Sequence, residues 1–435
     1  MSSVFRRSAS PIRAARAKGA WVYDTDGRGY LDAASGALVS TVGHGDPSIV
    51  AALAGAAGNL DYVHPSVFTT AAIEEYSARV AKLVPVSGAM VFPTSGGAES
   101  VEAAVKLARS YHLARGEDRR IVISRRQSYH GNTLGSLRLS GRPPLRGPYE
   151  PWLVGTSFVP EVNEYRCPNP DHPTACARWH GNQLEDVIRA AGPGNVAAFI
   201  GESIGGATLA AAVPPDGYWE EIARVCYDNG ILLIVDEVMT GFARTGSWFA
   251  IQEWDVEPDI LVSGKGAGAG YWPLGLCVAS GEVHDQVMAA GGFVHGSTFS
   301  HSPIGAAVGM AVLDRIESDD LIEAARSMGA RLRGMLEHAL SQVPFIGEIR
   351  GRGMLIGVEL VADQETKAPF PRERQFVEDL TERAAERGLL VYPSVGCADG
   401  TLGDSILIGP PLTIDDEELV AISDRLQSAL EKISG

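Results

Sequence analysis

The feature that most constrains the fold is an alternation of short apolar runs with longer helix-like stretches between residues 88 and 300. This alternation is typical of βα units and predicts an α/β fold with a mostly parallel central sheet. Polar or glycine-rich residues follow each apolar run. Since ligands of open α/β sheets bind beyond the carboxyl ends of the strands, we expect these segments to form one site. The expected strands are 89–92, 121–123, 196–200, 231–235 and 260–262.

The pattern changes at residue 304, where helical stretches surround a single apolar run at 354–360. Such a mixture predicts a smaller α+β domain. We therefore expect an N-terminal segment (1–50) that joins the small domain, a large α/β domain (51–303) and the C-terminal small domain (304–435).

Composition excludes several classes of protein. The 435 residues carry a formal net charge of −16, which disfavours a nucleic-acid partner because phosphate binding needs Lys and Arg. No apolar run is long enough to predict a membrane span. Five scattered cysteines suit a reducing, cytoplasmic location. The basic first 23 residues loosely resemble a transit peptide, but we favour a basic lead-in to the first strand.

Lys265 is the candidate nucleophile. It stands among glycines directly after an apolar run, where desolvation lowers the pKa of an amine and makes it competent to form an imine. A phosphate-binding lysine is the rival interpretation, although the P-loop pattern is absent. Asp236 follows another strand that is expected to be buried, so it needs a cationic partner such as a protonated pyridine nitrogen. Capping of the following turn explains an isolated Asp equally well.

Three further strand ends add candidates. Ser95, Gly96 and Gly97 open a helix whose free amides can bind a phosphate, or they form an ordinary Ser N-cap. Tyr129 can stack on a flat cofactor or belong to the core. Glu202 is a second buried acid that can meet a substrate amine or an arginine, and structural pairing explains it equally well.

Together these motifs resemble the class III aminotransferases in residue type, order and spacing, and the likeness spans nearly the whole chain. The resemblance implies a fold type I architecture, a homodimer with active sites at the subunit interface, and pyridoxal 5′-phosphate as cofactor. It also implies transfer of an amino group from a donor amine to a carbonyl acceptor. The segments that carry it are Pro93-Thr-Ser-Gly-Gly-Ala-Glu99, Tyr129-His-Gly131, Asp236-Glu-Val-Met-Thr-Gly-Phe-Ala-Arg-Thr-Gly246 and Ser263-Gly-Lys-Gly266.

By motif position, the resemblance implies a role for each cofactor residue. Lys265 would be the Schiff-base lysine and the proton carrier. Asp236 would meet the pyridine nitrogen, Val238 would pack behind the ring and Tyr129 would stack in front of it. The remaining cofactor residues would bind the phosphate, with Ser95, Gly96 and Gly97 in the same subunit and Thr298 reaching across from its neighbour.

The substrate side departs from the family pattern. Leu407 stands where the ornithine and 4-aminobutyrate enzymes have an arginine, and no Arg or Lys lies between residues 387 and 425. Either another arginine binds a substrate carboxylate, with Arg142, Arg244 and Arg352 as candidates, or the principal substrate is not a simple α-amino acid. In both cases we expect a substrate that is not of the simple ornithine or 4-aminobutyrate type. An unpaired Glu202 would favour a cationic or polyhydroxylated amine. The expected substrate-facing residues are Leu38, Glu202 and Leu407.

Three questions stay open from sequence. Racemases, aminomutases and decarboxylases share this fold, so the motifs specify the cofactor more firmly than the type of reaction. A noncatalytic pyridoxal-binding protein is disfavoured, because no additional domain is visible and both Lys265 and Asp236 are retained.

Four potential metal ligands lie in one loop, but their spacing fits no standard zinc finger, and we expect incidental cysteines rather than a metal site. These four are Cys167, His172, Cys176 and His180.

Overall fold

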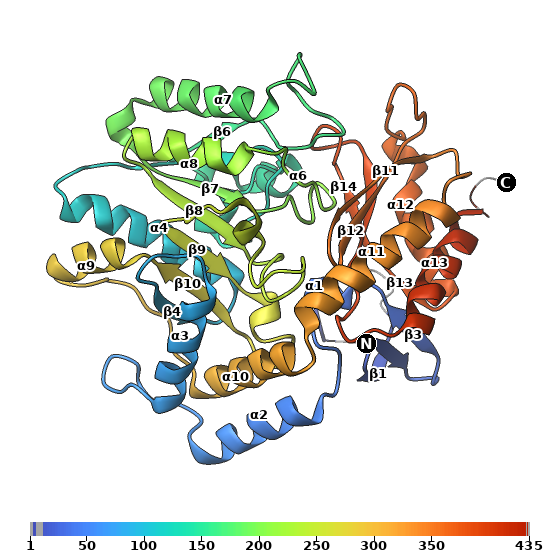
Figure 1. The fold of residues 1–435 in the computed structure, drawn as a ribbon, viewed down its shortest axis with the longest axis horizontal. Coiled ribbons are helices and arrows are strands. Elements are labelled where there is room, and N and C mark those ends of the chain that lie inside the picture. The colour runs from blue at the N-terminus through green and yellow to red at the C-terminus, as the bar shows by residue number, and fades with distance from the viewer. Residues whose placement is uncertain (1–2, 6–11, 432, 434–435) are drawn as a thin grey trace.

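The computed structural model describes residues 3–5, 12–431 and 433, so Arg6 and Arg7 of the basic lead-in lie outside the described residues. A seven-stranded sheet forms the centre of the larger part (Figure 1). Its strands, in order across the sheet, are β4 (Met90–Thr94), β10 (Gly275–Ala279), β9 (Ile260–Ser263), β8 (Leu232–Glu237), β7 (Val196–Glu202), β5 (Ile121–Arg125) and β6 (Thr156–Val159).

The prediction of an α/β fold with a mostly parallel sheet is confirmed, and all five expected strands belong to this sheet. β10 alone runs antiparallel to its neighbours, β4 and β9. The connection from β9 to β10 (264–274) is too short for the helical crossover that a parallel strand needs. β6 and β10 were not predicted as strands.

Both faces of the sheet are buried, and the alternation of side chains along each strand divides the core in two. Ile234 of β8 belongs to the cluster on one face, together with Val101 and Val105 of α4 (Gly97–Ala114). Leu233 and Val235 belong to the cluster on the other face, which includes side chains of α7 and α8. The remaining helices of this part are α1 (Ser35–Leu38), α2 (Pro47–Asn59), α3 (Ala71–Leu83), α5 (Leu134–Leu137), α6 (Pro143–Arg146), α7 (Cys176–Ala191), α8 (Tyr218–Asp228), α9 (Gly281–Ala289) and α10 (Pro303–Ser318).

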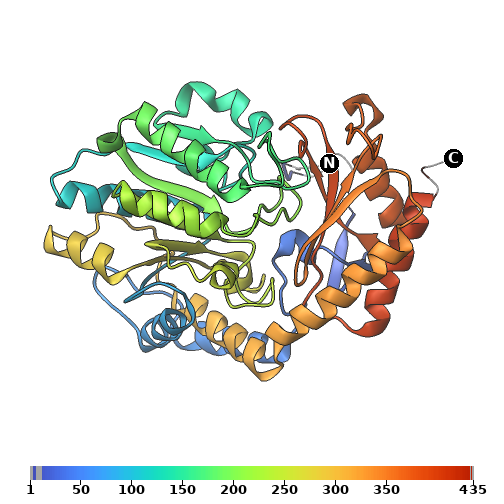
Figure 2. The same cartoon turned by 45° about the horizontal axis from the view of Figure 1, so that its top comes forward.

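The smaller part holds two four-stranded sheets beside the large sheet (Figure 2). One has the order β11 (Ile346–Arg352), β12 (Leu355–Leu360), β15 (Asp404–Ile408) and β14 (Tyr392–Val395), all antiparallel. The other has the order β1 (Ala14–Lys18), β2 (Trp21–Asp24), β3 (Gly29–Asp32) and β13 (Leu389–Leu390). The helices here are α11 (Leu321–Ala339), α12 (Phe376–Glu386) and α13 (Asp416–Glu431).

The N-terminal strands contribute to the small part, because β3 pairs in parallel with β13 from the C-terminal region. This pairing supports the predicted joining of segment 1–50 to the small domain, and the domain division as a whole stays a prediction. Among the described residues, no helix combines the length and the apolar character needed to cross a membrane.

Candidate active site

Lys265 follows β9 and begins the short 3-10 helix η4 (Lys265–Ala267). Its side chain keeps some exposed surface, but the surrounding protein desolvates the amine and lowers its pKa to about 8. The negative charges of Asp236 and Glu202 oppose this shift, and the guanidinium of Arg244 adds to it. Near neutral pH the amine therefore titrates in a range where it can both give and take a proton.

β8 ends in two acids, Asp236 and Glu237. Their side chains lie in different surroundings, because successive side chains of a strand point to opposite faces of the sheet. Asp236 is buried, and its Oδ2 lies 2.6 Å from Nδ1 of His130. Its Oδ1 accepts a hydrogen bond of 3.0 Å from the Val238 amide. Glu237 instead accepts hydrogen bonds from Ser203 Oγ at 2.6 Å and from the Ile251 amide at 2.7 Å. Glu237 is thus a structural acid, while Asp236 is close enough to Lys265 to influence its pKa.

His130 is a site residue that sequence reasoning missed as an individual position. It is buried after β5, and its backbone amide donates to Ser140 Oγ at 2.9 Å. The only signal for it was its place inside the Tyr129-His-Gly131 motif. Because the imidazole contacts the Asp236 carboxylate, it fixes the position of that acid.

Glu202 lies directly beside Asp236 in the register between β7 and β8. Its Oε1 accepts from the Gly206 amide at 3.0 Å and its Oε2 accepts from the Tyr129 amide at 3.3 Å. Burial raises the pKa of Glu202, against the influence of His130 and Arg125. Backbone amides of two loops hold this carboxylate, and no ion pair joins it to an arginine among the described residues. The preference for a cationic or polyhydroxylated amine stays a prediction.

The start of α4 has the properties of an anion site. No side chain caps this helix, and Ser95 turns its hydroxyl to Glu99 Oε2 at 2.6 Å. A Cβ atom on Gly97 would lie 2.7 Å from Cγ1 of Val238, and one on Gly264 would lie 3.1 Å from the Gly97 amide. Gly97 therefore has to be glycine, and the uncapped amides at this helix start can meet a phosphate.

The three candidate arginines differ in their surroundings. Arg352 forms an ion pair with Glu253 and keeps more than a third of its side-chain surface exposed. Arg244 is buried and donates to the Pro410 carbonyl at 2.6 Å, and desolvation lowers its pKa to about 10. Its Nε and Nη2 atoms have no hydrogen-bond partner among the described residues.

Arg142 reaches from the large part to the small one. Its Nη2 donates to the Val395 carbonyl of β14 at 2.8 Å, while its buried Nε has no partner among the described residues. Tyr129 lies near enough to act electrostatically on its guanidinium. Desolvation lowers the pKa of Arg142, so an anion beside it would be favoured.

Leu38 and Leu407 are both buried. A Cβ atom on Gly409 would lie 2.9 Å from Cδ2 of Leu38, and Leu407 pairs with Gly357 across β15 and β12. Thr298 is exposed and lines a hollow of about 550 Å³ together with Tyr62.

Comparison with known proteins identifies the family. Residues 4–430 match the family described as Aminotransferase class-III. The chain is 37% identical over 430 residues to the uncharacterized aminotransferase YodT of Bacillus subtilis, covering 98% of this chain and 96% of that protein. The protein therefore belongs to the class III aminotransferases and is an aminotransferase. Enzymes of this family depend on pyridoxal phosphate and act on amine and carbonyl substrates.

Solved structures agree with this assignment. An (S)-enantioselective omega-transaminase from Thermomicrobium roseum superposes with a TM-score of 0.92 at 35% identity, over 98% of this chain and 93% of that one. The omega-transaminase from Pseudomonas jessenii in complex with PMP gives a TM-score of 0.92 at 32% identity, with the same coverage of 98% and 93%. These similarities confirm the fold type I architecture.

Proposed function

We propose that this enzyme binds pyridoxal 5′-phosphate at Lys265 and moves an amino group from a donor amine to an aldehyde or keto acceptor. The observation that carries the proposal is the position of Lys265, whose amine has a pKa of about 8 and lies near the buried pair of Asp236 and His130. A titrating amine beside a fixed, buried acid suits a covalent cofactor that contains a basic ring nitrogen.

The chain's own residues fit this cofactor. The uncapped start of α4 at Gly96 and Gly97, with Ser95 before it, would bind the phosphate. Asp236 would meet the ring nitrogen, while Val238 and Tyr129 would lie against the two faces of the ring. When bound, pyridoxal phosphate supplies an electron sink that stabilises negative charge on the substrate carbon.

Lys265 has two tasks in the proposed mechanism. Its Nζ would hold the cofactor covalently before substrate arrives, and its neutral form would then take a proton from the substrate carbon and deliver it to the cofactor carbon that receives the amino group. A pKa of about 8 makes both protonation states available near neutral pH. His130 and the Val238 amide hold both oxygens of Asp236, which would fix this carboxyl group beside the ring.

A homodimer completes the proposed site. Thr298 and its surroundings carry exposed apolar side chains, among them Phe299 (63% exposed) and Val294 (92% exposed). An apolar patch of this kind marks a protein interface on a soluble enzyme. We propose that this surface meets a second copy of the chain and that Thr298 reaches the phosphate of the neighbouring site.

We propose that the substrate is not a simple amino acid of the ornithine or 4-aminobutyrate type. Leu407 offers no charge, and Arg352 is paired with Glu253. Buried guanidinium nitrogens of both Arg142 and Arg244 lack a partner among the described residues. We favour Arg142 as the contact for a carboxylate, such as that of a keto acid acceptor, because Tyr129, the proposed stacking ring, acts electrostatically on its guanidinium. Leu38 and Glu202 would line the substrate side.

Five cysteines support a cytoplasmic location as part of the proposal. All five are free thiols in the structure, and four of them are buried. Unpaired thiols persist in reducing compartments, where disulfides rarely form.

Incubation of the holoenzyme with a panel of single donors tests the reaction type. A transaminase converts a stoichiometric amount of donor to its carbonyl product without any acceptor and retains the amino group, which shifts the absorbance of the bound cofactor. A racemase or decarboxylase would instead turn over catalytically on the donor alone. Catalytic turnover without acceptor would therefore contradict the proposal.

A further inference from the structure

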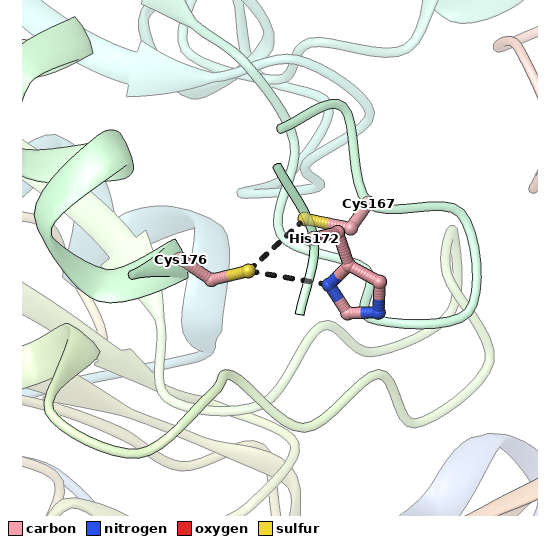
Figure 3. A group of neighbouring side chains, drawn as sticks. All are labelled: Cys167, His172 and Cys176. Carbon is pink, nitrogen blue, oxygen red and sulfur yellow. Dashed lines mark hydrogen bonds between the residues drawn. The ribbon is translucent and has the colours of Figure 1, made fainter. Parts of the chain in front are cut away.

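The loop between β6 and α7 brings together three side chains that the proposed reaction does not use (Figure 3). Cys167 Sγ lies 3.7 Å from Cys176 Sγ, and His172 Nδ1 lies 3.2 Å from Cys176 Sγ. All three atoms lie within 4.8 Å of one another. His180, the fourth candidate in the sequence, is not among them, because its ring is buried between Trp179 and Tyr218 at centroid distances of 4.9 and 5.4 Å.

Two of these distances match edges of a zinc tetrahedron. With bonds of about 2.3 Å to sulfur and 2.0–2.1 Å to nitrogen, two sulfurs lie about 3.8 Å apart and a sulfur lies about 3.5 Å from a nitrogen. The spacing of Cys167 and Cys176 agrees with the first value, and that of His172 and Cys176 is only slightly shorter than the second. A metal ion would therefore need little rearrangement along these two edges, and the third edge, from Cys167 Sγ to His172 Nδ1, lies within 4.8 Å.

The surroundings of Cys176 supply a donor to its sulfur. Asn169 is buried, and its Nδ2 donates to Cys176 Sγ at 3.4 Å and to the Thr174 carbonyl at 2.9 Å. Amide donors to a ligand sulfur are typical of groups that orient the ligands of metal sites. Cys176 is also the first residue of α7, whose start has no side-chain cap, so the helix dipole adds favourable positive potential.

We propose that Cys167, His172 and Cys176 bind a zinc ion, with the fourth position open to water on the exposed side of His172. Two thiolates and an imidazole select zinc over magnesium or calcium, which prefer oxygen ligands. This proposal replaces the sequence-based expectation of incidental cysteines. It does not depend on the proposed cofactor.

The loop that carries the site also contacts the small part. Arg166, beside Cys167, forms an ion pair with buried Glu359 of β12. Lys367 of the small part donates to the Tyr165 carbonyl at 2.8 Å. The ion would therefore fix the loop through which the large part contacts the small one.

Zinc content of the untagged holoenzyme, purified without chelators and measured by mass spectrometry of the metal, tests the proposal. About one zinc per chain is expected in the wild type. The Cys167→Ala/Cys176→Ala variant should contain almost none. The matched control Cys226→Ala/Cys277→Ala also removes two thiols and should keep its zinc. Equal zinc content in the two variants would overturn the proposal.

Cobalt binding to the metal-stripped holoenzyme gives a second measurement that does not require the double variant to fold. The wild type should develop a sulfur-to-cobalt charge-transfer band. His172→Ala changes an exposed residue and should weaken cobalt binding at least about tenfold, since even loss of an outer group costs that much. A wild type without the band overturns the site. A Cys167–Cys176 disulfide, found by mass spectrometry of protein alkylated at cell lysis, would also overturn it.

Discussion

His130 and Asp236 lie 106 positions apart in the chain, yet Nδ1 of the buried imidazole is 2.6 Å from Oδ2 of the buried carboxylate. A buried acid is costly without a partner, and this contact gives Asp236 both a partner and a fixed orientation. The pair lies at the carboxyl ends of β5 and β8, next to the lysine that follows β9.

We expect His130→Ala to lower kcat about 10- to 100-fold, because a hydrogen bond to a charged group is worth about 1.5–3 kcal/mol. The imidazole holds Asp236 rather than the substrate, so KM should change less than kcat. His112→Gln alters another buried histidine, which contacts the Ala197 carbonyl, and should leave kcat unchanged. Steady-state kinetics of both variants with one donor give kcat and KM. A kcat within twofold of wild type for His130→Ala would contradict the role.

Overpacking costs about 1–3 kcal/mol. Because it would displace the amides that meet the phosphate, Gly97→Ala should weaken cofactor binding by up to about that amount. The new Cβ would lie 2.7 Å from Cγ1 of Val238. In Gly97→Ala/Val238→Ala the clash disappears, so the double variant should bind the cofactor about as well as Val238→Ala alone. Gly55→Ala, at an open position on α2, is the control. Additive losses, measured by titration of the stripped enzyme with cofactor, would show that steric contact with Val238 is not the cause.

Arg142→Leu should raise KM for a keto acid acceptor about tenfold or more, since a charged hydrogen bond is lost, while KM for a neutral aldehyde stays the same. Arg352→Leu removes a guanidinium that is already paired with Glu253 and should change neither value. Initial rates with pyruvate and with an uncharged aldehyde separate the two effects. Parallel changes for both acceptors would mean that Arg142 acts through the fold and not on the carboxylate.

Acid should destabilise the fold through His180. Burial lowers the pKa of this residue from 6.5 to about 4, so the unfolded chain binds a proton between these pH values that the folded chain does not. The contribution of His180 to the free energy of unfolding is therefore fully present above pH 6.5, and it falls by roughly 3 kcal/mol as the pH drops to 4.

His180→Phe keeps a ring in this place and cannot take up the proton. Urea titrations at several pH values measure its free energy of unfolding. Between pH 6.5 and pH 4 this free energy should fall by roughly 3 kcal/mol less than that of the wild type. The exposed His338, changed to Gln, is the control and should follow the wild type. Identical pH dependence in His180→Phe and wild type would exclude this histidine as the cause.

The sequence predicted the strands and their polar ends because each strand is a local pattern. Ile231–Val235, for example, is a continuous apolar run, which a strand covered on both faces requires. The antiparallel direction of β10 could not be predicted, because it depends on the short connection after β9 and not on the composition of the strand. β6 was missed for another reason: its side chains are only half-buried at most positions.

Contacts between distant segments could not be predicted. The partners of Glu202 are amides of Tyr129 and Gly206, and no pattern in the chain states that these loops meet. His130 and Asp236 come together only because β5 and β8 both border β7. Likewise, spacing alone placed His180 with the loop cysteines, whereas the helical turn directs its ring toward Tyr218.

Reduction of the holoenzyme with borohydride, followed by digestion and mass spectrometry, tests the central claim most directly. Reduction makes the link between lysine and cofactor permanent, so the mass of a pyridoxyl phosphate group should appear on the peptide that contains Lys265 and on no other lysine. Lys265→Ala should show no such group and should lose about 10²- to 10⁴-fold in rate from the missing proton transfer. A pyridoxyl group on another lysine of the wild type, or one that persists in Lys265→Ala, would contradict the account.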